Sequence, residues 1–337
     1  MKRSIRIVGG GLAGLALGNA LRRDGVEVQL YEKRRYPFHR VCGEFLCGVS
    51  KETLEALGLE NYFEDAVRIE RMRWFLRDRC VVDEALPKSG LGISRYTLDA
   101  RLARAFEDAG GMLDQGVAFD SDDSEGVVWA SGRAGAQAGK WIGLSAHFED
   151  LPITCLEMYC GSQGYVGLSP VESGRVNVTG LFKVDRELRG ASEKLLFAYL
   201  LANQSPGLVD QLRAASYVGG SFAAIAGFDF GQQKSVGQFA LGDQRLLIPP
   251  FAGNGMSMAL EAAAHARGCL VDYLARRSSW NEALEAQQRH DTAAFKLRMQ
   301  VAQSMHPLLL SPLASGILAY LSAKGYLPTH RIFSALR

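Results

Sequence analysis

A glycine motif near the N-terminus constrains the fold of this 337-residue chain more than any other feature. Gly9, Gly11 and Gly14 follow a short β-branched strand pattern and precede a helical pattern that ends at Gly25. A second alternating strand pattern then leads to Glu32. Strand, G-x-G-x-x-G turn, helix, strand and acidic residue, in this order, are typical of a dinucleotide-binding βαβ unit. We therefore predict an α/β protein with a Rossmann-type domain.

Each residue of the motif has its own physical role. Gly9 permits the tight turn, Gly11 lets the backbone approach a pyrophosphate, and Gly14 lets the helix pack against the strand. The helix N-terminus offers free N–H groups and the positive end of its dipole to phosphates, while Glu32 accepts hydrogen bonds from a ribose. The cofactor contacts predicted in this segment are Gly9, Gly11, Leu12, Ala13, Gly14, Glu32 and Lys33.

A second glycine cluster, far downstream, favours FAD over NAD as the cofactor. A short apolar strand ends at Asp243, and the bend at residues 249–256 leads into a helix predicted over about 257–277. Asp243 is expected to bind the ribityl or pyrophosphate region, and the bare backbone of Gly253 and Gly255 is expected near a flavin ring. The helix dipole would stabilise negative charge on the reduced flavin. The contacts predicted here are Asp243, Pro250, Gly253, Gly255 and Met256.

Together with several shorter segments, the two clusters resemble the geranylgeranyl reductase-like flavoproteins. This family belongs to the superfamily of aromatic hydroxylases and flavin-dependent halogenases, which have a para-hydroxybenzoate hydroxylase-like fold. The resemblance covers roughly residues 1–275 and implies a non-covalently bound FAD. The other matching segments are residues 40–46, 95–99, 127–133, 164–170 and 176–178.

The resemblance also implies roles for single residues near the flavin. Arg40 and Cys42 are expected close to the ring, and Arg95 is expected to reach the flavin or the pyrophosphate. Simpler alternatives exist for two of them. Arg95 can form an ion pair with Asp99, one helical turn further on, and Cys42 can be a small buried residue.

Three residues are candidates for catalysis: Cys42, His147 and Tyr165. His147 lies where the chain enters the predicted substrate sheet, either as a general base facing a cavity or as a hydrogen-bonded structural histidine. Tyr165 can donate a hydrogen bond to the substrate or fill one face of a strand. For Cys42 a packing role competes with a redox or covalent role. Nearby Glu44 can be an active-site acid or the surface end of a strand.

Strand and helix patterns alternate in a way that predicts two interleaved domains and a helical tail. The tail, residues 277–337, contains an amphipathic helix over 282–305 that His306-Pro307 is expected to end. A further helix is expected over 100–109, after the segment 95–99. The predicted Rossmann-type FAD-binding domain comprises residues 1–66, 92–145 and 235–276, and the predicted antiparallel β-sheet substrate domain comprises residues 67–91 and 146–234.

Composition and charge exclude several other classes of protein. A net charge of +2 offers no basic surface for nucleic acid. The six cysteines form no C-x-x-C pair, so we expect reduced thiols, no metal site, no secretory signal and a cytoplasmic location. The apolar run at residues 308–321 is interrupted by polar residues and is not predicted to span a membrane. It is either a buried helix pair or a surface in peripheral contact with a membrane or lipid-like substrate.

We therefore predict an FAD-dependent oxidoreductase that acts on an apolar small molecule. We favour hydroxylation of an aromatic or polyketide-like substrate by a monooxygenase, because residues 165–170 depart from the aromatic-rich segment of the reductase branch. The alternative is reduction of a carbon–carbon double bond, as in geranylgeranyl reductases. Since only one dinucleotide motif is present, the expected electron donor is transiently bound NAD(P)H, or else a protein. An NAD(P)-dependent dehydrogenase and a non-catalytic flavin-binding protein remain as further alternatives.

Overall fold

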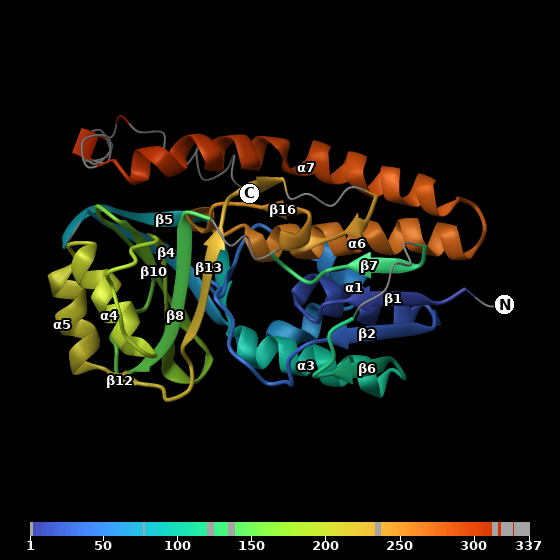
Figure 1. Cartoon of the computed structure of the whole chain (residues 1–337), viewed down its shortest axis with the longest axis horizontal. Coiled ribbons are helices and arrows are strands. Elements are labelled where there is room, and N and C mark those ends of the chain that lie inside the picture. Colours follow the sequence, from blue (N-terminus) through green and yellow to red (C-terminus); the bar gives the residue numbers. More distant parts are fainter. Residues whose placement is uncertain are drawn as a thin grey trace.

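The computed structural model describes residues 3–76, 78–119, 125–133, 139–232, 237–311, 316–317 and 326. Two β-sheets lie toward opposite ends of an elongated molecule, and the long helix α7 (Trp280–Leu309) runs along its upper edge (Figure 1). This helix begins with a capping box, in which Ser279 and Glu282 each accept a hydrogen bond from the other's backbone N–H.

The first sheet is parallel and forms the centre of the Rossmann-type domain. Its strand order is β15-β7-β1-β2-β6, so the glycine turn follows the central strand. Helix α1 packs against both α3 and α6. The elements are β1 (Ile5–Val8), α1 (Leu12–Arg23), β2 (Val28–Glu32), α3 (Arg95–Asp108), β6 (Met112–Gln115), β7 (Val127–Trp129), β15 (Phe239–Ala240) and α6 (Gly255–Leu274).

The second sheet is antiparallel apart from its β4–β9 pair. Its order is β12-β8-β11-β10-β9-β4-β5-β3, and β13 also pairs with β8. One face joins the large core shared with the Rossmann-type domain, and the other packs under α4 (Glu193–Ala202) and α5 (Pro206–Ala214). The strands are β3 (Phe45–Leu46), β4 (Val67–Leu76), β5 (Arg79–Gly92), β8 (Trp141–Glu149), β9 (Leu156–Cys160), β10 (Gly164–Val171), β11 (Arg175–Lys183), β12 (Ser216–Tyr217) and β13 (Ala223–Phe228).

Short elements complete the described chain. They include a third, two-stranded sheet that lies beside the bend leading into α6. These elements are α2 (Lys51–Leu57), η1 (Glu60–Phe63), η2 (Glu172–Gly174), β14 (Gly231–Gln232), η3 (Gly242–Gln244), β16 (Leu246–Leu247) and η4 (Pro250–Ala252).

The predicted fold class is confirmed, but three predicted boundaries need correction. All of β8 belongs to the antiparallel sheet, including residues 141–145, which were expected in the Rossmann-type domain, because β8 pairs with β11 from Trp141 to Phe148. Helix α3 starts at Arg95 and not near residue 100, because Ser94 caps it by accepting a hydrogen bond from the Thr97 N–H. Helix α7 continues through Pro307 to Leu309, since a proline near a helix end costs few backbone hydrogen bonds.

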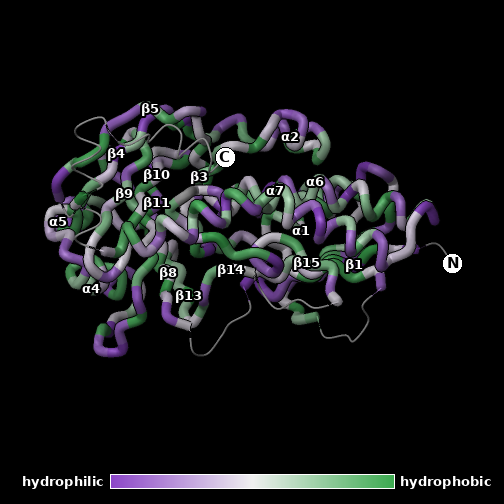
Figure 2. The backbone as a smooth tube through the Cα atoms, turned by 90° about the horizontal axis from the view of Figure 1, so that it is seen from above, coloured by the Kyte–Doolittle hydropathy of each residue, from purple (hydrophilic) through white to green (hydrophobic). Residues whose placement is uncertain are grey.

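Hydrophilic and hydrophobic positions are interleaved along α6 and α7 (Figure 2). Within the described ranges, no helix has the length and the apolar character needed to cross a membrane. Most of the apolar run at residues 308–321 lies outside the described residues, as do residues 120–124 and most of the predicted tail after 311.

Candidate functional site

The glycine turn between β1 and α1 is shaped by two tight contacts and one opening. A Cβ atom at Gly9, whose φ is +108°, would overlap the Ala130 carbonyl oxygen, and one at Gly14 would overlap the Gly9 carbonyl oxygen. A Cβ atom at Gly11 would meet only the Arg95 Nη2 atom, 3.9 Å away. Gly11 is the N-cap of α1, and no side chain caps this end. The first N–H groups of α1 therefore have no side-chain cap, which suits an anion-binding helix end.

Glu32 ties the glycine turn to the end of β2. Its buried carboxylate accepts hydrogen bonds from the backbone N–H of Gly10 and of Arg34, both at 3.0 Å, and it pairs with the Arg40 guanidinium at 3.0 Å. The neighbouring Lys33, also predicted as a cofactor contact, is exposed. Glu32, which is predicted to bind a ribose, thus also orients the glycine turn and the Arg40 guanidinium.

A series of alternating charges runs from Glu32 toward Cys42. Arg40 Nε lies 2.9 Å from Asp99 Oδ2, and Asp99 also holds the Arg95 Nε atom at 2.7 Å. The Arg95 guanidinium also interacts with the Cys42 thiol. The expected Arg95–Asp99 ion pair is therefore present. Burial raises the pKa of the Cys42 thiol, and the Arg95 charge opposes this only in part. Cys42 is therefore a neutral thiol at neutral pH and a poor nucleophile.

Glu44 joins the two domains through its carboxylate. One oxygen accepts a hydrogen bond from the Arg95 backbone N–H at 2.8 Å, and the other lies 2.7 Å from His147 Nε2. Both side chains of this pair are at most 2% exposed. Glu44 has a φ of +52°, a left-handed conformation that is strained for a non-glycine residue. Glu44 is thus a buried interdomain contact and not the surface end of a strand.

The Nδ1 atom of His147 has no hydrogen-bond partner among the described residues, although it is buried. The His39 ring lies edge-on to the His147 ring, with centroids 4.8 Å apart. Burial lowers the pKa of His39 to about 4, and the nearby His147 adds to this effect. His39 is therefore neutral near pH 7. The Nδ1 atom is therefore the ring nitrogen of His147 that the described residues leave without a hydrogen-bond partner.

Polar side chains of the antiparallel sheet hold the loop that contains Cys42. The Cys42 carbonyl oxygen accepts hydrogen bonds from Asn177 Nδ2 at 2.8 Å and from the Thr179 hydroxyl at 2.6 Å. Ser145, on the adjacent strand, donates to Asn177 Oδ1 at 2.9 Å. These bonds, together with the Glu44–His147 pair, fix the loop on the face of the sheet that joins the shared core.

The second glycine cluster adjoins the first. A Cβ atom at Gly242 would lie 3.5 Å from the Ala13 Cβ, which places η3 against the first turn of α1. Gly253 has a φ of +66°, and Gly255, the first residue of α6, has open space where a Cβ would be. Of the other predicted contacts, Asp243 is partly exposed beside Arg133 at 3.4 Å, Leu12, Ala13 and Met256 are buried, and Pro250 is exposed.

Asn254, between these two glycines, is fully buried with an unpaired side chain. Neither its Oδ1 nor its Nδ2 atom has a hydrogen-bond partner among the described residues. A buried carboxamide without partners is costly, so its presence here indicates a bound group with both a donor and an acceptor. The pyrimidine edge of a flavin has that pattern. The residues of this junction therefore fit FAD.

Tyr165 lies beside the same bend, but in an aromatic cluster. Its ring makes edge contacts with Phe251 and His306, with centroids 6.0 and 5.7 Å apart, and burial raises the pKa of its hydroxyl well above the ordinary value. His306 also packs against Trp141, and burial lowers its pKa to about 4. Tyr165 is thus a neutral packing residue at the edge of the site, separate from the cluster of Cys42 and His147.

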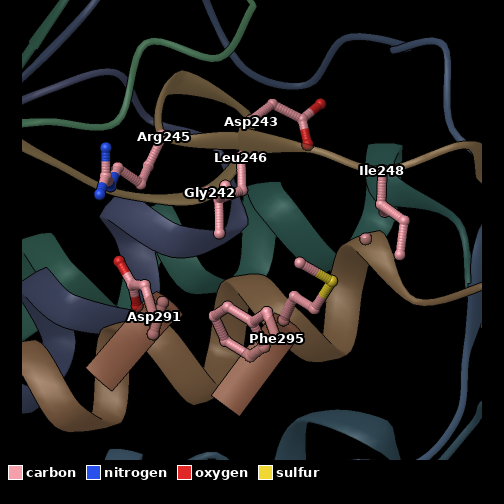
Figure 3. A pocket seen from close by; sticks show the side chains of 10 residues that line it. Gly242, Asp243, Arg245, Leu246, Ile248, Asp291 and Phe295 are labelled. Carbon is pink, nitrogen blue, oxygen red and sulfur yellow. The ribbon is translucent and has the colours of Figure 1, made fainter. Parts of the chain in front are cut away.

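A small pocket opens on the α7 side of the second cluster (Figure 3). It is lined by Asp243, Arg245, Asp291 and Phe295, among other residues. The Arg245 Nε atom is buried without a partner among the described residues, and the Asp291 carboxylate accepts a hydrogen bond from Gln287 at 2.9 Å. Burial raises the pKa of Asp291 to about 7, against the opposing charge of Arg245.

We expect the Asp291→Asn variant to be more stable than the wild type at pH 8, and the difference to be smaller at pH 5. The wild-type carboxyl group keeps its proton in the folded state up to about pH 7, but loses it near pH 4 in the unfolded state. The protonated Asp291 carboxyl group thus makes its full contribution to the stability of the folded state below pH 4, and this contribution is lost as the pH rises through 7. The stability difference between the variant and the wild type should be about 2–3 kcal/mol larger at pH 8 than at pH 5. Thermal melts at both pH values measure it. Equal shifts at both pH values, or the same trend in the exposed control Asp210→Asn, would contradict this assignment.

Three residues are more important to the site than the sequence indicated: Asn254 was not predicted, Asp99 was expected only as a partner of Arg95, and Glu44 was expected as an active-site acid or the surface end of a strand. The sequence gives only a weak indication of Asp99 and Asn254. Asp99 stands four residues after Arg95 on a helix, and Asn254 stands between two glycines. Glu44 belongs to a recognised segment, but its partner His147 is 103 positions away, so sequence spacing gives no sign of the pair. Within the described residues, no group of three or more His, Cys, Asp or Glu side chains is placed to hold a metal ion.

Comparisons with known proteins agree with this geometry. Residues 7–42 match the family of NAD(P)-binding Rossmann-like domains. The chain is 24% identical to a menaquinone reductase of Mycobacterium tuberculosis, over 76% of this chain and 73% of that protein. A probable FAD-dependent monooxygenase from Pseudomonas aeruginosa is 16% identical, with a TM-score of 0.72 over 94% of this chain and 99% of that one. A geranylgeranyl bacteriochlorophyll reductase-like protein from Thermoplasma acidophilum is 17% identical, with a TM-score of 0.75 over 99% and 95%.

The chain therefore has the fold of FAD-dependent oxidoreductases. Its structural neighbours include a probable FAD-dependent monooxygenase, a flavin-dependent brominase and a reductase-like protein. The fold expected from the resemblance to the geranylgeranyl reductase-like flavoproteins is confirmed by these neighbours. They also agree with the predicted enzyme class and with FAD as the cofactor.

Proposed function

We propose that this chain binds FAD and oxidises or reduces an apolar small molecule on the face of its antiparallel sheet. The observation that carries the proposal is the junction of α1, η3 and α6. There a Cβ atom at Gly242 of η3 would lie 3.5 Å from the Ala13 Cβ in α1 and 4.0 Å from the Ala259 Cβ in α6. The N-terminus of α1 at Gly11 has no side-chain cap, and the carboxamide of Asn254, which precedes α6, has no partner among the described residues. A dinucleotide with a hydrogen-bonding ring satisfies both features, whereas a simple dehydrogenase would not need the second.

The chain's own residues suit the binding of such a cofactor. The first N–H groups of α1 and the backbone of Gly11 receive the pyrophosphate, and Glu32 receives the ribose. Asn254 and the first N–H groups of α6 receive the polar edge of the ring. Bound FAD supplies hydride or electron transfer that no side chain can provide. Arg40 and Arg95, each already paired with Asp99, add positive charge beside the phosphates and ring.

Among the three candidates for catalysis, His147 is the one we propose to move a proton. Glu44 holds its Nε2 atom, which fixes the ring and leaves Nδ1 to act as base or acid. The neutral thiol of Cys42 lines the ring site beside Arg95. Tyr165 packs at the aromatic border of the site against Phe251 and His306, and its buried hydroxyl, whose pKa is raised by burial, stays neutral.

We favour hydroxylation by a monooxygenase as the reaction. It is supported by residues 165–170 of β10, which depart from the aromatic-rich segment of the reductase branch. Reduction of a carbon–carbon double bond is the second candidate, and the sequence likeness to menaquinone reductases favours it. NAD(P)H is the proposed electron donor, with a protein donor as the alternative.

The six cysteines are free thiols, which fits the proposed cytoplasmic location. Peripheral contact with a membrane would bring in an apolar substrate.

Purified protein should be yellow and should release FAD on heating. A colourless protein that cannot be reconstituted with FAD would overturn the proposal. The two reactions are separated by following NAD(P)H oxidation with and without O₂ in the presence of an aromatic or quinone compound. A hydroxylase consumes O₂ in proportion to product, whereas product formed without O₂ would show that the second candidate is correct.

We expect Asn254→Leu to weaken FAD binding at least about tenfold while stabilising the FAD-free protein by about 1 kcal/mol. The apolar side chain of similar shape removes an unpaired buried carboxamide, and with it the proposed hydrogen bonds to the ring. Flavin titration and thermal melts of the FAD-free protein measure the two effects. Ser278→Ala, which removes another unpaired buried hydroxyl away from the proposed FAD contacts, is the control and should retain wild-type FAD affinity. Unchanged FAD affinity in Asn254→Leu would show that the carboxamide does not meet the cofactor.

A further inference from the structure

The centre of the antiparallel sheet contains two accessible positions that lie side by side. Gly167 is the one residue of β10 that is not buried, and Thr179 is the one such residue of β11 apart from its two ends. The two are cross-strand partners. Because directly opposed residues present their side chains on the same face of a sheet, Gly167 and Thr179 mark a single opening between β10 and β11, whose other central residues are buried.

The space above Gly167 is not filled by the protein's described residues. A Cβ atom there would meet only the backbone oxygens of Glu157 and Thr179, both 3.9 Å away. Other glycines of the same sheet are closely packed. A Cβ at Gly143 would lie 2.7 Å from Val41 Cγ1, and one at Gly180 would overlap the Phe182 ring. A glycine in mid-strand with open space is typical of a place where a ligand approaches the backbone.

This opening lies on the side of the sheet that faces the candidate cofactor site. Tyr165, two residues before Gly167 and therefore on the same face, packs against Phe251 of the bend that leads into α6. Thr179 donates its hydroxyl to the Cys42 carbonyl oxygen, so the loop around Cys42 borders the opening. Gly43 in this loop also has open space where a Cβ would be.

A polar group lies next to the opening on the same strand. Ser169, two residues after Gly167, is 1% exposed, and its hydroxyl has no hydrogen-bond partner among the described residues. An unpaired buried hydroxyl is stabilised by a ligand oxygen that accepts its hydrogen bond. The open space above Gly167 and the unpaired hydroxyl together match the edge of a flat ring that carries an oxygen atom.

We propose that Gly167 determines the substrate specificity of this site. The space above it receives a planar, oxygen-bearing ring of an aromatic or quinone substrate, and the Ser169 hydroxyl binds the ring oxygen. This inference rests on the proposed function, since it assigns the substrate class of the same site. Because glycine contributes no side chain, the ring can lie directly on the strand between the sheet and the Cys42 loop.

The test measures ring binding without relying on turnover. The probe is 2-methyl-1,4-naphthoquinone, and the comparison compound is 2-methylnaphthalene, a similar ring without oxygen atoms. The binding of each compound is followed by calorimetric titration of the FAD-loaded protein. We expect Gly167→Trp to raise the Kd of the quinone at least about tenfold, since the indole occupies the ring's place. Gly167→Ala, whose methyl group fits within the 3.9 Å contacts, should change it less than about threefold.

Ser169→Ala should weaken the binding of the quinone about three- to tenfold and leave the binding of 2-methylnaphthalene unchanged. Gly219→Trp, at an exposed loop position with open space, controls for adding a tryptophan and should bind both probes like the wild type. FAD content and thermal melts of each variant show whether it has folded.

Equal quinone affinity in Gly167→Trp and the wild type would overturn the inference, and so would a loss in Gly219→Trp as large as that in Gly167→Trp. If Gly167→Trp does not fold, Gly167→Phe and Ser169→Ala decide the question by the same titrations. A wild-type protein that binds no FAD would instead overturn the proposed function, which the spectrum shows before any quinone is added.

Discussion

A Gly11→Val variant should fold normally and lose FAD, with an affinity at least about 100-fold below that of the wild type. The fold tolerates the side chain because a Cβ at Gly11 would meet only the Arg95 Nη2 atom, 3.9 Å away. The branched side chain would, however, stand in front of the first N–H groups of α1. It would replace several charge-assisted hydrogen bonds to the pyrophosphate with an apolar surface. Flavin titration and thermal melts of the FAD-free protein measure the two quantities.

Two comparisons make this prediction specific to the site. Gly268→Val places the same side chain on α6, where a Cβ has open space, and should retain FAD. Gly9→Val should instead fail to fold, because its Cβ would overlap the Ala130 carbonyl oxygen and its φ of +108° is strained for valine. A Gly11→Val protein with a normal flavin content would show that the pyrophosphate does not approach this turn.

A Glu44→Ala variant should lose about 3–5 kcal/mol of stability, which lowers the Tm of a chain of this length by about 4–7 °C. The substitution leaves the Arg95 N–H and the His147 Nε2 atom buried without their acceptor. Alanine also keeps the strained left-handed conformation that Glu44 adopts at a φ of +52°. Because one bond goes to each domain, we also expect weaker FAD binding than in the wild type.

The matched variants separate the hydrogen bonds from the loss of side-chain volume. Glu44→Gln keeps an acceptor for the Arg95 N–H and should cost less than Glu44→Ala. Glu70→Ala, at an exposed position on β4, should stay within about 0.5 kcal/mol of the wild type. A double-mutant cycle with His147→Phe should show a coupling of about 1–3 kcal/mol. Additive effects in that cycle, or an unchanged Tm in Glu44→Ala, would contradict the interdomain role.

Much of the cofactor site could be predicted from local sequence patterns. The turn from Gly9 to Gly14 is constrained by the strand before it and the helix after it, so its conformation follows from residues close together in the chain. The same holds for the bend before α6, where Gly253 has the left-handed φ of +66° that glycine readily adopts. Helix α3 begins at Arg95, before the expected start at residue 100, because the Ser94 side chain caps it.

The candidate catalytic residues depended on contacts that no local pattern records. Cys42 and His147 come together because the loop between β2 and β3 lies on the sheet and Glu44 bridges it to β8. Tyr165 was predicted on equal terms with them, yet it lies in a separate aromatic cluster with His306, a residue from α7. Its neighbours were set by the packing of a helix far away in the chain.

The sequence by itself determined the Rossmann-type turn and the second glycine cluster, and these two segments predict the type of cofactor. These rest on backbone conformations that only glycine at certain positions allows, within short and continuous segments. Only the tertiary structure decided which polar groups lack partners. The unpaired side chains of Asn254 and Ser169, and the space above Gly167, arise from how separate elements pack. A ligand is recognised by such unfilled space and unpaired groups, and these exist only once distant parts of the chain have come together.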